Sequence, residues 1–312
     1  MAISESGSGQ QSEPLDATFD YSALQSRLGA LLRKQLFFVG GLAKSGTTWV
    51  QLLLDGHPQV SCSGELHLCN RLFPALKSTL EAHNALLLEK TRMLFAETAP
   101  EPPLFAAEEL QFLFASAVLL LLAARASDET VLAVGEKTPE NAQFLARLGQ
   151  IFPTARFIHV VRDPRDAAVS AWFHVLRTIP EETRLHFASA SDYFRYYVQQ
   201  WVAQVRLGEE FGRRHPHRYV EVTYEALSAE PEPALAALLR FLGVDHGSDA
   251  VRRCLSAAVF ERLSGGRGRG REDRASLFRK GIVGDWKNHF GAEDQRYAIE
   301  KAGPYMRRFG FI

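Results

Sequence analysis

A glycine-rich segment between an apolar run and a helical pattern constrains this chain more than any other part of its sequence. The apolar run at residues 36–39 (LFFV) ends at a glycine pair, and residues 47–54 follow with helical spacing. Between them lies the loop GLAKSGTT at residues 41–48. The backbone N–H groups of such a loop and the N-terminus of the next helix converge on an anion. The segment therefore predicts a phosphate-binding loop.

The loop differs from that of nucleotide triphosphatases in the position of its lysine. The triphosphatase form is G-x-x-x-x-G-K-[ST], whereas here Thr47 occupies the lysine position and the lysine is Lys44. A loop without the lysine for β- and γ-phosphates is poorly suited to ATP hydrolysis. It can hold a shorter 5′ group, with Lys44 near the atom that is transferred.

The rest of the chain alternates short apolar runs with helical patterns. Further strands are predicted at residues 131–134, 156–161 and 219–222, and an amphipathic helix at residues 20–32. Strands that alternate with helices favour a parallel sheet with both faces covered. We therefore predict an α/β fold in which helices flank a parallel sheet.

The domain organisation follows from composition along the chain. Residues 1–19 are predicted to be a disordered leader, and residues 20–312 a single domain, because no linker interrupts them. Residues 67–129 are mostly helical in pattern, and we expect them to form a cap over the carboxyl edge of the sheet. The apolar run at residues 117–124 is too short to cross a membrane.

Charge and cysteine content limit the classes of partner. The chain has 36 Lys and Arg against 36 Asp and Glu, so no overall positive field attracts nucleic acid or an anionic membrane. Its three cysteines have neither metal-site nor disulfide-framework spacing. The N-terminus lacks the pattern of a secretory signal. These features predict a cytoplasmic protein that binds neither nucleic acid nor membranes.

Three segments together resemble one known family. They are KSGTTW at residues 44–49, RDPRDAAVS at residues 162–170, and RKGIVGDWKN at residues 279–288. In this order they are similar to segments of the sulfotransferases that use 3′-phosphoadenosine 5′-phosphosulfate (PAPS). The resemblance implies the P-loop-like sulfotransferase fold, a single α/β domain with the phosphate loop after its first strand.

The resemblance implies that PAPS is the donor, which requires two anion sites and a slot for adenine. It assigns Lys44, Ser45, Gly46, Thr47 and Thr48 to the 5′-phosphosulfate, Trp49 and Tyr224 to adenine, and Arg162, Ser170, Arg279, Lys280 and Gly281 to the 3′-phosphate. Structural alternatives exist for some of these residues. Arg162 can form a surface ion pair with Asp163 or Asp166, and the two aromatic rings can belong to the core.

The general base is the point at which the chain departs from one branch of the family. Cytosolic small-molecule sulfotransferases use a histidine in a Lys-Thr-His segment, but residues 135–139 here read GEKTP. Carbohydrate and tyrosylprotein sulfotransferases instead use a glutamate that follows a His-Pro pair. This chain has His-Pro at residues 57–58 and then Glu65. The resemblance makes Glu65 the base and places Lys137 beside the sulfuryl group, with His67 as the competing base.

The implied reaction is in-line sulfuryl transfer from PAPS to a hydroxyl group, with release of adenosine 3′,5′-bisphosphate. Glu65 takes the proton of the hydroxyl, while Lys44 and Lys137 stabilise charge on the reacting oxygens. A sulfuryl group carries less charge than a terminal phosphoryl group, so cationic side chains can replace a bridging metal. We therefore expect no metal site.

The acceptor is less constrained than the donor. Apolar residues in the segments expected to line its pocket favour a small alcohol or phenol: Phe73, Leu76, Trp172 and Phe173. A peptide tyrosine or a sugar hydroxyl stays an alternative, and the oligomeric state is open.

Two other functions are alternatives to sulfuryl transfer. One is a P-loop kinase or NTPase with Asp163 as a magnesium ligand, and the other is a nucleotide-binding module without catalysis.

Overall fold

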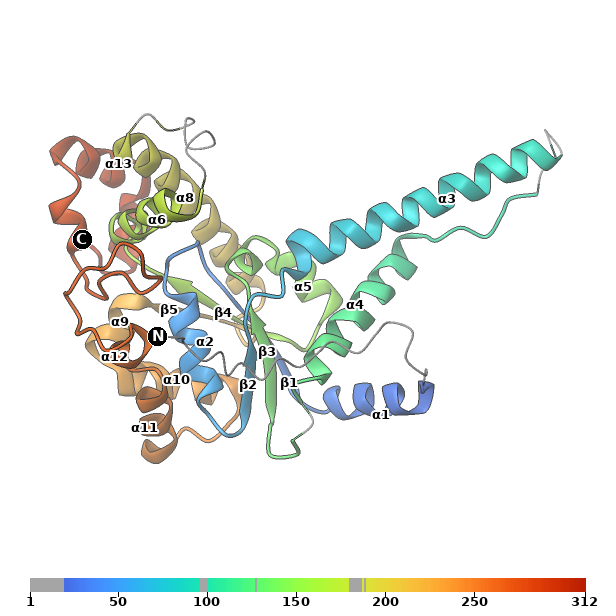
Figure 1. The fold of residues 1–312 in the computed structure, drawn as a ribbon, viewed down its shortest axis with the longest axis horizontal. Helices are drawn as coiled ribbons and strands as arrows, with labels where there is room; N and C mark the ends of the chain where they lie inside the picture. The colour runs from blue at the N-terminus through green and yellow to red at the C-terminus, as the bar shows by residue number, and fades with distance from the viewer. Residues whose placement is uncertain (1–19, 96–99, 127, 180–186, 188) are drawn as a thin grey trace, which may run out of the picture.

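A parallel sheet of five strands forms the centre of the protein (Figure 1). The structure is a computed structural model that describes residues 20–95, 100–126, 128–179, 187 and 189–312. The strand order is β2-β3-β1-β4-β5, and every neighbouring pair is parallel. The strands are β1 (Gln35–Gly40), β2 (Val60–Ser63), β3 (Ala133–Lys137), β4 (Arg156–Val161) and β5 (Tyr219–Thr223). The predicted α/β class is confirmed.

Two strands differ from the sequence prediction. The strand β2 was not predicted, and β3 was expected at residues 131–134 but begins at Ala133. The three remaining predicted strands coincide with β4 and, to within one residue at either end, with β1 and β5. Both differences arise where buried residues of a strand are polar, because a search for apolar runs passes over them.

Helices connect the strands and cover both faces of the sheet (Figure 1). They are α1 (Tyr21–Leu31), α2 (Thr47–Asp55), α3 (Phe73–Phe95), α4 (Ala107–Ala123), α5 (Leu145–Ile151), α6 (Pro164–Thr178), α8 (Ala190–Arg214), α9 (Tyr224–Ala229), α10 (Pro231–Leu242), α11 (Ser248–Ala257), α12 (Phe260–Leu263) and α13 (Ala292–Arg308), with short π- or 3₁₀-helices η1 (Leu68–Leu72), η3 (Pro139–Gln143) and η4 (Asp285–Asn288).

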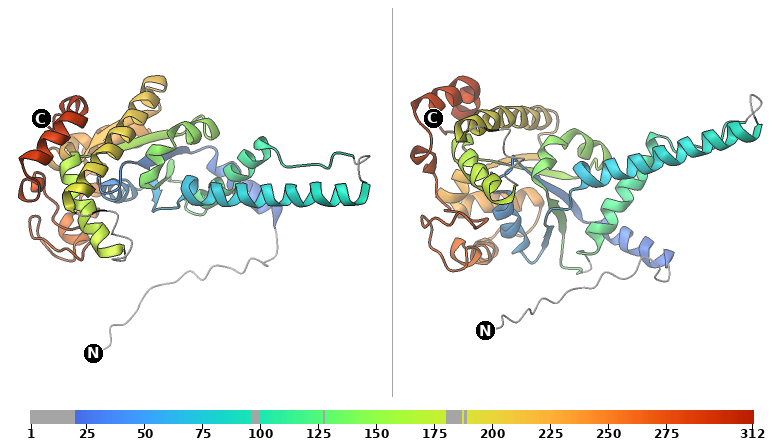
Figure 2. Two further views of the ribbon diagram at one scale, coloured as in Figure 1. Left: turned by 90° about the horizontal axis from the view of Figure 1, so that it is seen from above. Right: turned by 45° about the horizontal axis from the view of Figure 1, so that its top comes forward.

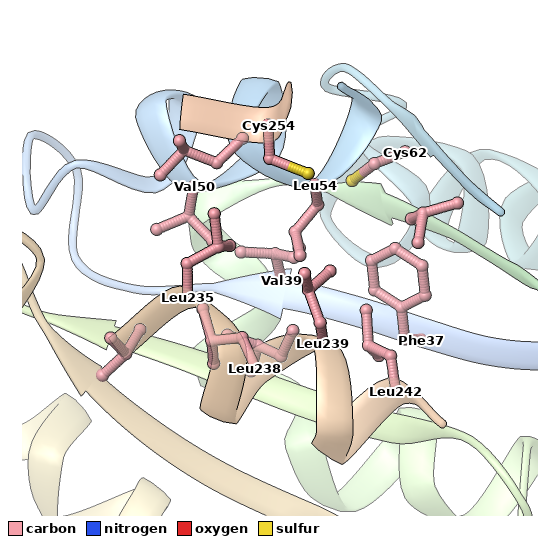
Figure 3. Close-up of a cluster of buried hydrophobic side chains, with 14 of the residues drawn as sticks. Phe37, Val39, Val50, Leu54, Cys62, Leu235, Leu238, Leu239, Leu242 and Cys254 are labelled. Atoms are coloured by element: carbon pink, nitrogen blue, oxygen red, sulfur yellow. The ribbon is translucent and has the colours of Figure 1, made fainter. Parts of the chain in front are cut away.

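The central strand β1 divides the core into two halves. Successive side chains of a strand point to opposite faces, so Phe37 and Val39 pack with α2, α10 and α11 (Figure 3). Leu36 and Phe38 pack on the other face with α4, α5 and Phe211 of α8. Burying each of these side chains stabilises the fold by roughly 2 kcal/mol. The phosphate loop that follows β1 is thus anchored from both sides of the sheet.

Within the segment predicted to cap the site, the helix α3 extends away from the body, whereas α4 packs against the core through Phe114, Val118 and Leu122. None of the 23 residues of α3 is buried, and Figures 1 and 2 show α3 projecting well beyond the sheet. A capping role for residues 67–129 stays a prediction. The leader predicted at residues 1–19 lies outside the described residues.

Helix length and apolar character decide whether a helix can span a membrane. Among the described residues, no helix is both long enough and apolar enough to cross a bilayer.

Candidate active site

Each of the five strands delivers a candidate site residue from its carboxyl end. The phosphate loop follows β1, Glu65 lies two residues after β2, and Lys137 is the last residue of β3. Arg162 directly follows β4, and Tyr224 directly follows β5. Carboxyl ends of parallel strands meet at one edge of the sheet, where α/β proteins bind their ligands. The sheet topology therefore brings together residues that are up to 180 positions apart in sequence.

The phosphate loop is a tight turn whose conformation depends on Gly46. That residue has a φ of 99°, and an added Cβ would lie 2.7 Å from the Tyr224 ring, so a side chain fits neither the backbone nor the space. Ser45 and Thr47 are buried beside it. The amides at the start of α2 consequently open toward a cavity, as anion binding at a helix N-terminus requires.

Lys44 combines a strained backbone with a shifted pKa. Its φ of 73° lies in the left-handed region, which costs a residue with a side chain about 1 kcal/mol or more. Burial, together with the charges of Arg177 and Arg162, lowers the pKa of its ammonium to about 8. A buried cation that loses its proton this readily gains most from an anionic ligand.

Glu65, Lys137 and Thr48 form a connected polar group beside the loop. The Lys137 ammonium donates to Glu65 Oε1 at 2.6 Å and to Thr48 Oγ1 at 3.1 Å. The Lys137 side chain is 3% exposed, whereas that of Glu65 is 41% exposed. The ammonium is therefore fixed in place, while the carboxylate is accessible from the cavity that it lines.

His67 lies beside the same carboxylate. Its Nε2 is 3.6 Å from Glu65 Oε2, and its Nδ1 is 3.2 Å from the amide nitrogen of Asn70. The contact with Asn70 orients the imidazole ring, so that its Nε2 edge faces Glu65.

Arg162 links the phosphate loop to the C-terminal segment. Its guanidinium donates to the carbonyl oxygens of Lys44 at 3.3 Å and Ile282 at 3.2 Å, and it stacks 4.1 Å from the centre of the Tyr224 ring. The alternative of an ion pair with Asp163 or Asp166 is not realised. Asp163 instead pairs with Arg165 at 2.6 Å, and the carboxylate of Asp166 accepts from two backbone amides.

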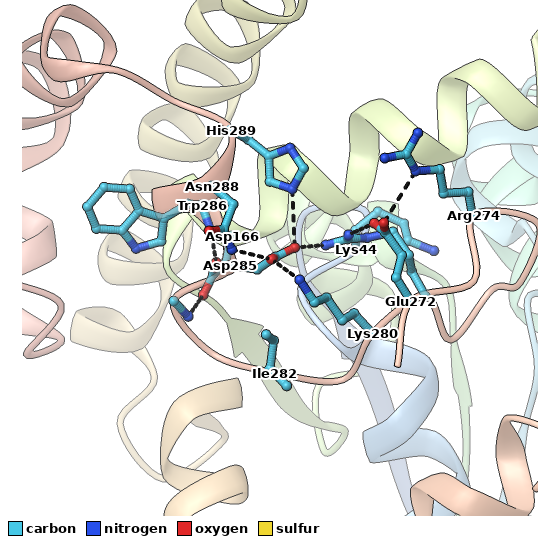
Figure 4. A network of polar contacts seen from close by, with 12 residues as sticks. Lys44, Asp166, Glu272, Arg274, Lys280, Ile282, Asp285, Trp286, Asn288 and His289 are labelled. Atoms are coloured by element: carbon cyan, nitrogen blue, oxygen red, sulfur yellow. Dashed lines mark hydrogen bonds and ion pairs between the residues drawn. The ribbon is translucent and has the colours of Figure 1, made fainter. Parts of the chain in front are cut away.

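A second group of cations is held by one buried carboxylate, Asp285. It accepts hydrogen bonds from Arg279, from Lys280 at 2.5 Å and from Asn288 at 3.0 Å (Figure 4). Burial alone would raise the pKa of Asp285, but hydrogen bonds from Lys280, Arg279 and Asn288 outweigh it and hold that pKa well below its usual range. Asp285 therefore stays ionised and keeps two cations in place near the cavity.

Asp166 ties this segment to the body of the protein. Its Oδ2 accepts from the Gly284 amide at 2.6 Å and its Oδ1 from the Trp286 amide at 2.9 Å. The helix α6 is thereby connected to the turn that carries Arg279 and Lys280. Neither Asp166 nor Asp285 was assigned a role from the sequence, although both lie inside the motifs that were recognised.

The aromatic residues assigned to adenine form one wall of the cavity. The Trp49 and Tyr224 rings lie 5.4 Å apart, edge to face, and Trp49 Nε1 donates to the Ala258 carbonyl at 3.2 Å. The guanidinium of Arg269 lies 5.2 Å from the Trp49 ring and 5.6 Å from that of Phe260. Arg269 and Phe260 both line the cavity, and neither was assigned a role from the sequence; Arg269 lies in a Gly- and Arg-rich loop at residues 264–274.

These groups surround a single cavity of about 420 Å³. Its walls include most of the predicted donor residues, among them Ser170 and Gly281. Gly281 has a φ of 67°, and a Cβ there would meet Phe260 at 2.4 Å. His174, which was not predicted, also lines the cavity, and its Nδ1 is 2.8 Å from Arg177.

The apolar residues expected to line an acceptor pocket do not border this cavity. Phe73 and Leu76 pack against the core cluster on one face of the sheet, Trp172 lies against Tyr193, and Phe173 lies between Arg274 and Arg279. The preference for an apolar acceptor stays a prediction.

Comparison with known proteins identifies the family. The model of the sulfotransferase family matches residues 37–248 of this chain. The chain belongs to the sulfotransferase family. The match begins in β1 and ends after β5 and α10, so it includes the phosphate loop, Glu65, Lys137 and Arg162.

Sequence relatives come from two groups of sulfotransferases. Protein-tyrosine sulfotransferase 2 of Gallus gallus is 27% identical over 216 residues, which cover 69% of this chain and 53% of that protein. Sulfotransferase 2A6 of Mus musculus is 26% identical over 151 residues, covering 44% and 51%. The chain spans about half the length of the curated relatives it matches.

Solved structures support the P-loop-like sulfotransferase fold. Mouse sulfotransferase SULT7A1 complexed with PAP has a TM-score of 0.55 and 19% identity, with 91% of this chain and 89% of that chain covered. Sulfotransferase STF9 from Mycobacterium avium has a TM-score of 0.51 and 15% identity, with 92% and 80% covered. At this level of identity the similarity concerns the fold.

Proposed function

We propose that this protein transfers the sulfuryl group of PAPS to a hydroxyl group of an acceptor and releases adenosine 3′,5′-bisphosphate. The observation that carries the proposal is the contact of Lys137 with both Glu65 and Thr48. It joins a candidate base, a candidate charge-stabilising cation and the phosphate loop within hydrogen-bond distance. Sulfuryl transfer requires this combination next to an anion site.

The cavity has the features that the donor requires. Lys44 and the loop amides offer a site for the 5′-phosphosulfate, and Arg162 and Arg279 offer a second anion site. In both arginines the buried Nε has no hydrogen-bond partner among the described residues, which is unfavourable unless a ligand accepts from it. Trp49 supplies an aromatic surface for the adenine. The mouse structure named above is complexed with PAP, which is consistent with this placement.

The proposed step forms one bond and breaks one. The acceptor oxygen bonds to sulfur while the bond from sulfur to the bridging phosphate oxygen breaks. Glu65 accepts the proton of the acceptor hydroxyl as its oxygen attacks. Lys44 and Lys137 stabilise the charge that grows on the bridging and sulfuryl oxygens. The leaving group is adenosine 3′,5′-bisphosphate, held by Arg162, Arg279 and Lys280.

Glu65 is favoured over His67 as the base for two reasons. The contact from Lys137 fixes one oxygen of Glu65, and the other oxygen, 3.6 Å from His67 Nε2, can accept a proton. Both ring nitrogens of His67 face neighbouring side chains, Asn70 and Glu65. Of these two candidate bases, Glu65 is the one that lines the cavity.

The kinase alternative explains fewer contacts. It requires Asp163 as a magnesium ligand, yet this carboxylate is buried in an ion pair with Arg165 and also accepts from the Arg165 amide at the start of α6. It also leaves the cluster around Asp285 without a role. A module without catalysis would not need the fixed contact between Lys137 and Glu65.

The acceptor class is proposed more broadly than the donor. The cavity that Glu65 lines is also lined by Lys44, His174 and Glu140, so it offers polar contacts to a hydroxylated acceptor. The experiment incubates the protein with PAPS and a panel of phenols, aliphatic alcohols, sugars and tyrosine-containing peptides. Mass spectrometry should detect one added sulfuryl group on one class, with an equal amount of bisphosphate released. Bisphosphate release without a sulfated acceptor would contradict the proposal.

A further inference from the structure

Two buried side chains of α8 hold the backbone segments on which the candidate donor site is built. Tyr197 Oη donates to the carbonyl oxygen of Ala43, in the phosphate loop, at 2.6 Å. Trp201 Nε1 donates to the carbonyl oxygen of Arg162, directly after β4, at 2.9 Å. Residues four positions apart lie on the same side of a helix. One face of α8 therefore supports the segments that follow β1 and β4, although none of its residues is among the described residues that line the cavity.

The contact of Tyr197 fixes the direction of the peptide group between Ala43 and Lys44. A peptide group is planar and trans, so its carbonyl oxygen and its N–H point in opposite directions. The carbonyl oxygen of Ala43 points to Tyr197, which is 3% exposed. The N–H of Lys44 consequently points to the other side of the loop, where Ala43 and Lys44 line the cavity.

The backbone at this point of the loop needs support from the surrounding protein. Lys44 has a φ of 73°, and a residue with a side chain keeps this left-handed conformation only where its neighbours hold it. Arg162 holds the next carbonyl oxygen, that of Lys44, at 3.3 Å. Rotation of the peptide group between Ala43 and Lys44 would turn a partly negative carbonyl oxygen toward the cavity, where it would repel an anion.

The Tyr197 hydroxyl is a donor wherever the protein is folded. A carbonyl oxygen can only accept a hydrogen bond, so the proton of this bond belongs to the hydroxyl. Burial raises the pKa of Tyr197 far above its usual range. The contact with Ala43 is therefore kept over the pH range in which the enzyme can be assayed.

We propose that Tyr197 is a positioning residue for sulfuryl transfer, whose hydroxyl holds the phosphate loop with the Lys44 amide facing the 5′-phosphosulfate. That group belongs to PAPS, so this role of Tyr197 rests on the proposed function. Tyr197 acts through the loop, because it does not line the cavity. Loss of its hydroxyl should weaken the binding of nucleotides that carry a 5′-phosphate and leave the rest of the nucleotide site unchanged.

A purely structural hydroxyl would behave differently. The Tyr197 ring belongs to the core cluster between α6, α8 and α13, and Tyr197→Phe keeps this ring and removes only the hydroxyl. If the hydroxyl served stability alone, the variant would unfold at a lower temperature but would not discriminate among nucleotides. The comparison of nucleotides with and without a 5′-phosphate therefore separates the two roles.

The test measures nucleotide binding to the full 312-residue chain by calorimetry. The ligands are adenosine 3′,5′-bisphosphate, adenosine 5′-monophosphate and adenosine 3′-monophosphate. In Tyr197→Phe we expect the two ligands with a 5′-phosphate to bind about five- to tenfold more weakly, which is the effect of one hydrogen bond. The affinity for the 3′-monophosphate should be unchanged.

The matched control is Tyr193→Phe, which removes a hydroxyl one turn earlier on α8. Tyr193 is also buried, and its ring packs against Trp172 and Phe187. This variant should bind all three ligands as the wild type does. Thermal unfolding followed by circular dichroism checks that both variants are folded.

The wild type separates a failure of this role from a failure of the proposed function. If the wild type prefers the bisphosphate to the 3′-monophosphate and Tyr197→Phe keeps the same ratio of affinities, the donor site stands and the role of Tyr197 is overturned. If the wild type gains no affinity from the 5′-phosphate, the loop does not bind that group, and the proposed donor site and the role of Tyr197 are both overturned.

Discussion

At the residue scale, the proposed chemistry depends most on Glu65. Glu65→Gln keeps the size of the side chain and can still accept a hydrogen bond from Lys137, but it cannot take a proton. We predict that kcat falls about 10²-fold or more, while the affinity for adenosine 3′,5′-bisphosphate is unchanged. Steady-state kinetics and calorimetry measure the two quantities.

The control for Glu65→Gln is the variant His67→Ala, which changes the competing candidate base beside Glu65. His67→Ala removes the imidazole beside the carboxylate and should change kcat comparatively little. If His67→Ala abolishes turnover while Glu65→Gln retains it under conditions where chemistry is rate-limiting, then His67 is the base.

Lys44 makes donor binding depend on pH. Burial and the nearby arginines lower the pKa of its ammonium from the model-peptide value of 10.5 to about 8, so the charge is present below pH 8 and is lost as the pH rises through 8. The affinity for adenosine 3′,5′-bisphosphate should therefore weaken above about pH 8. The free protein should show the opposite trend in stability, because the unfolded chain keeps that proton up to about pH 10.5.

The control for this pH effect is Lys44→Arg, because a guanidinium stays charged over the whole range. Calorimetric titrations from pH 6 to about 10 should show a flat affinity for the variant above pH 8, even if its affinity is lower overall. The same decline in the wild type and in Lys44→Arg would mean that another group titrates.

At the element scale, the strands that the sequence predicted well, β1, β4 and β5, each hold at least three large apolar residues that no more than one polar residue separates. The strand β3 was misplaced because it ends in Gly135, Glu136 and Lys137, which are polar or small yet buried. Glu136 is tolerated there because Asn141 and Thr138 donate to its carboxylate, although burial still raises its pKa to about 7. Hydropathy cannot anticipate such hydrogen bonds.

The strand β2 was missed for a related reason. It has four residues, VSCS, all buried, and two serines break the apolar run. Glu65 nevertheless lies two residues after the end of β2, and its assignment from the motif did not require that strand to be recognised.

The Arg-rich loop at residues 264–274 gives a prediction at the same scale. Its backbone is joined to the anion-binding segment, since Gly270 N donates to Lys280 O at 2.8 Å and Asp273 N to Arg279 O at 2.9 Å. When Arg279 and Lys280 bind a phosphate, these amides should exchange with solvent more slowly. Hydrogen exchange with and without adenosine 3′,5′-bisphosphate measures this.

The internal control for that experiment is α3, which is remote from the cavity. Its amides should exchange equally with and without the nucleotide. An unchanged loop, or protection of α3 and the loop to the same extent, would contradict the assignment of Arg279 and Lys280 to the 3′-phosphate.

At the scale of the whole molecule, the sequence predicted the site better than the shape. The motifs follow strands, and a parallel sheet necessarily gathers the carboxyl ends of its strands at one edge. By contrast, the direction of α3 depends on contacts with distant residues, such as those of Phe73 with Phe114 and of Asn84 with Phe105, which no local pattern encodes. The contacts that Asp285 makes were equally inaccessible, because they join residues across a turn with glycines at positive φ.

The central claim is that the protein transfers a sulfuryl group. The most direct test offers sulfur-labelled PAPS and γ-phosphate-labelled ATP in parallel, each with a hydroxylated acceptor panel and with a chelator of divalent metals. We predict that the label of PAPS appears on an acceptor at a rate that the chelator leaves largely unchanged, while ATP transfers nothing. Transfer of the ATP label that requires magnesium, with no transfer from PAPS, would contradict the claim.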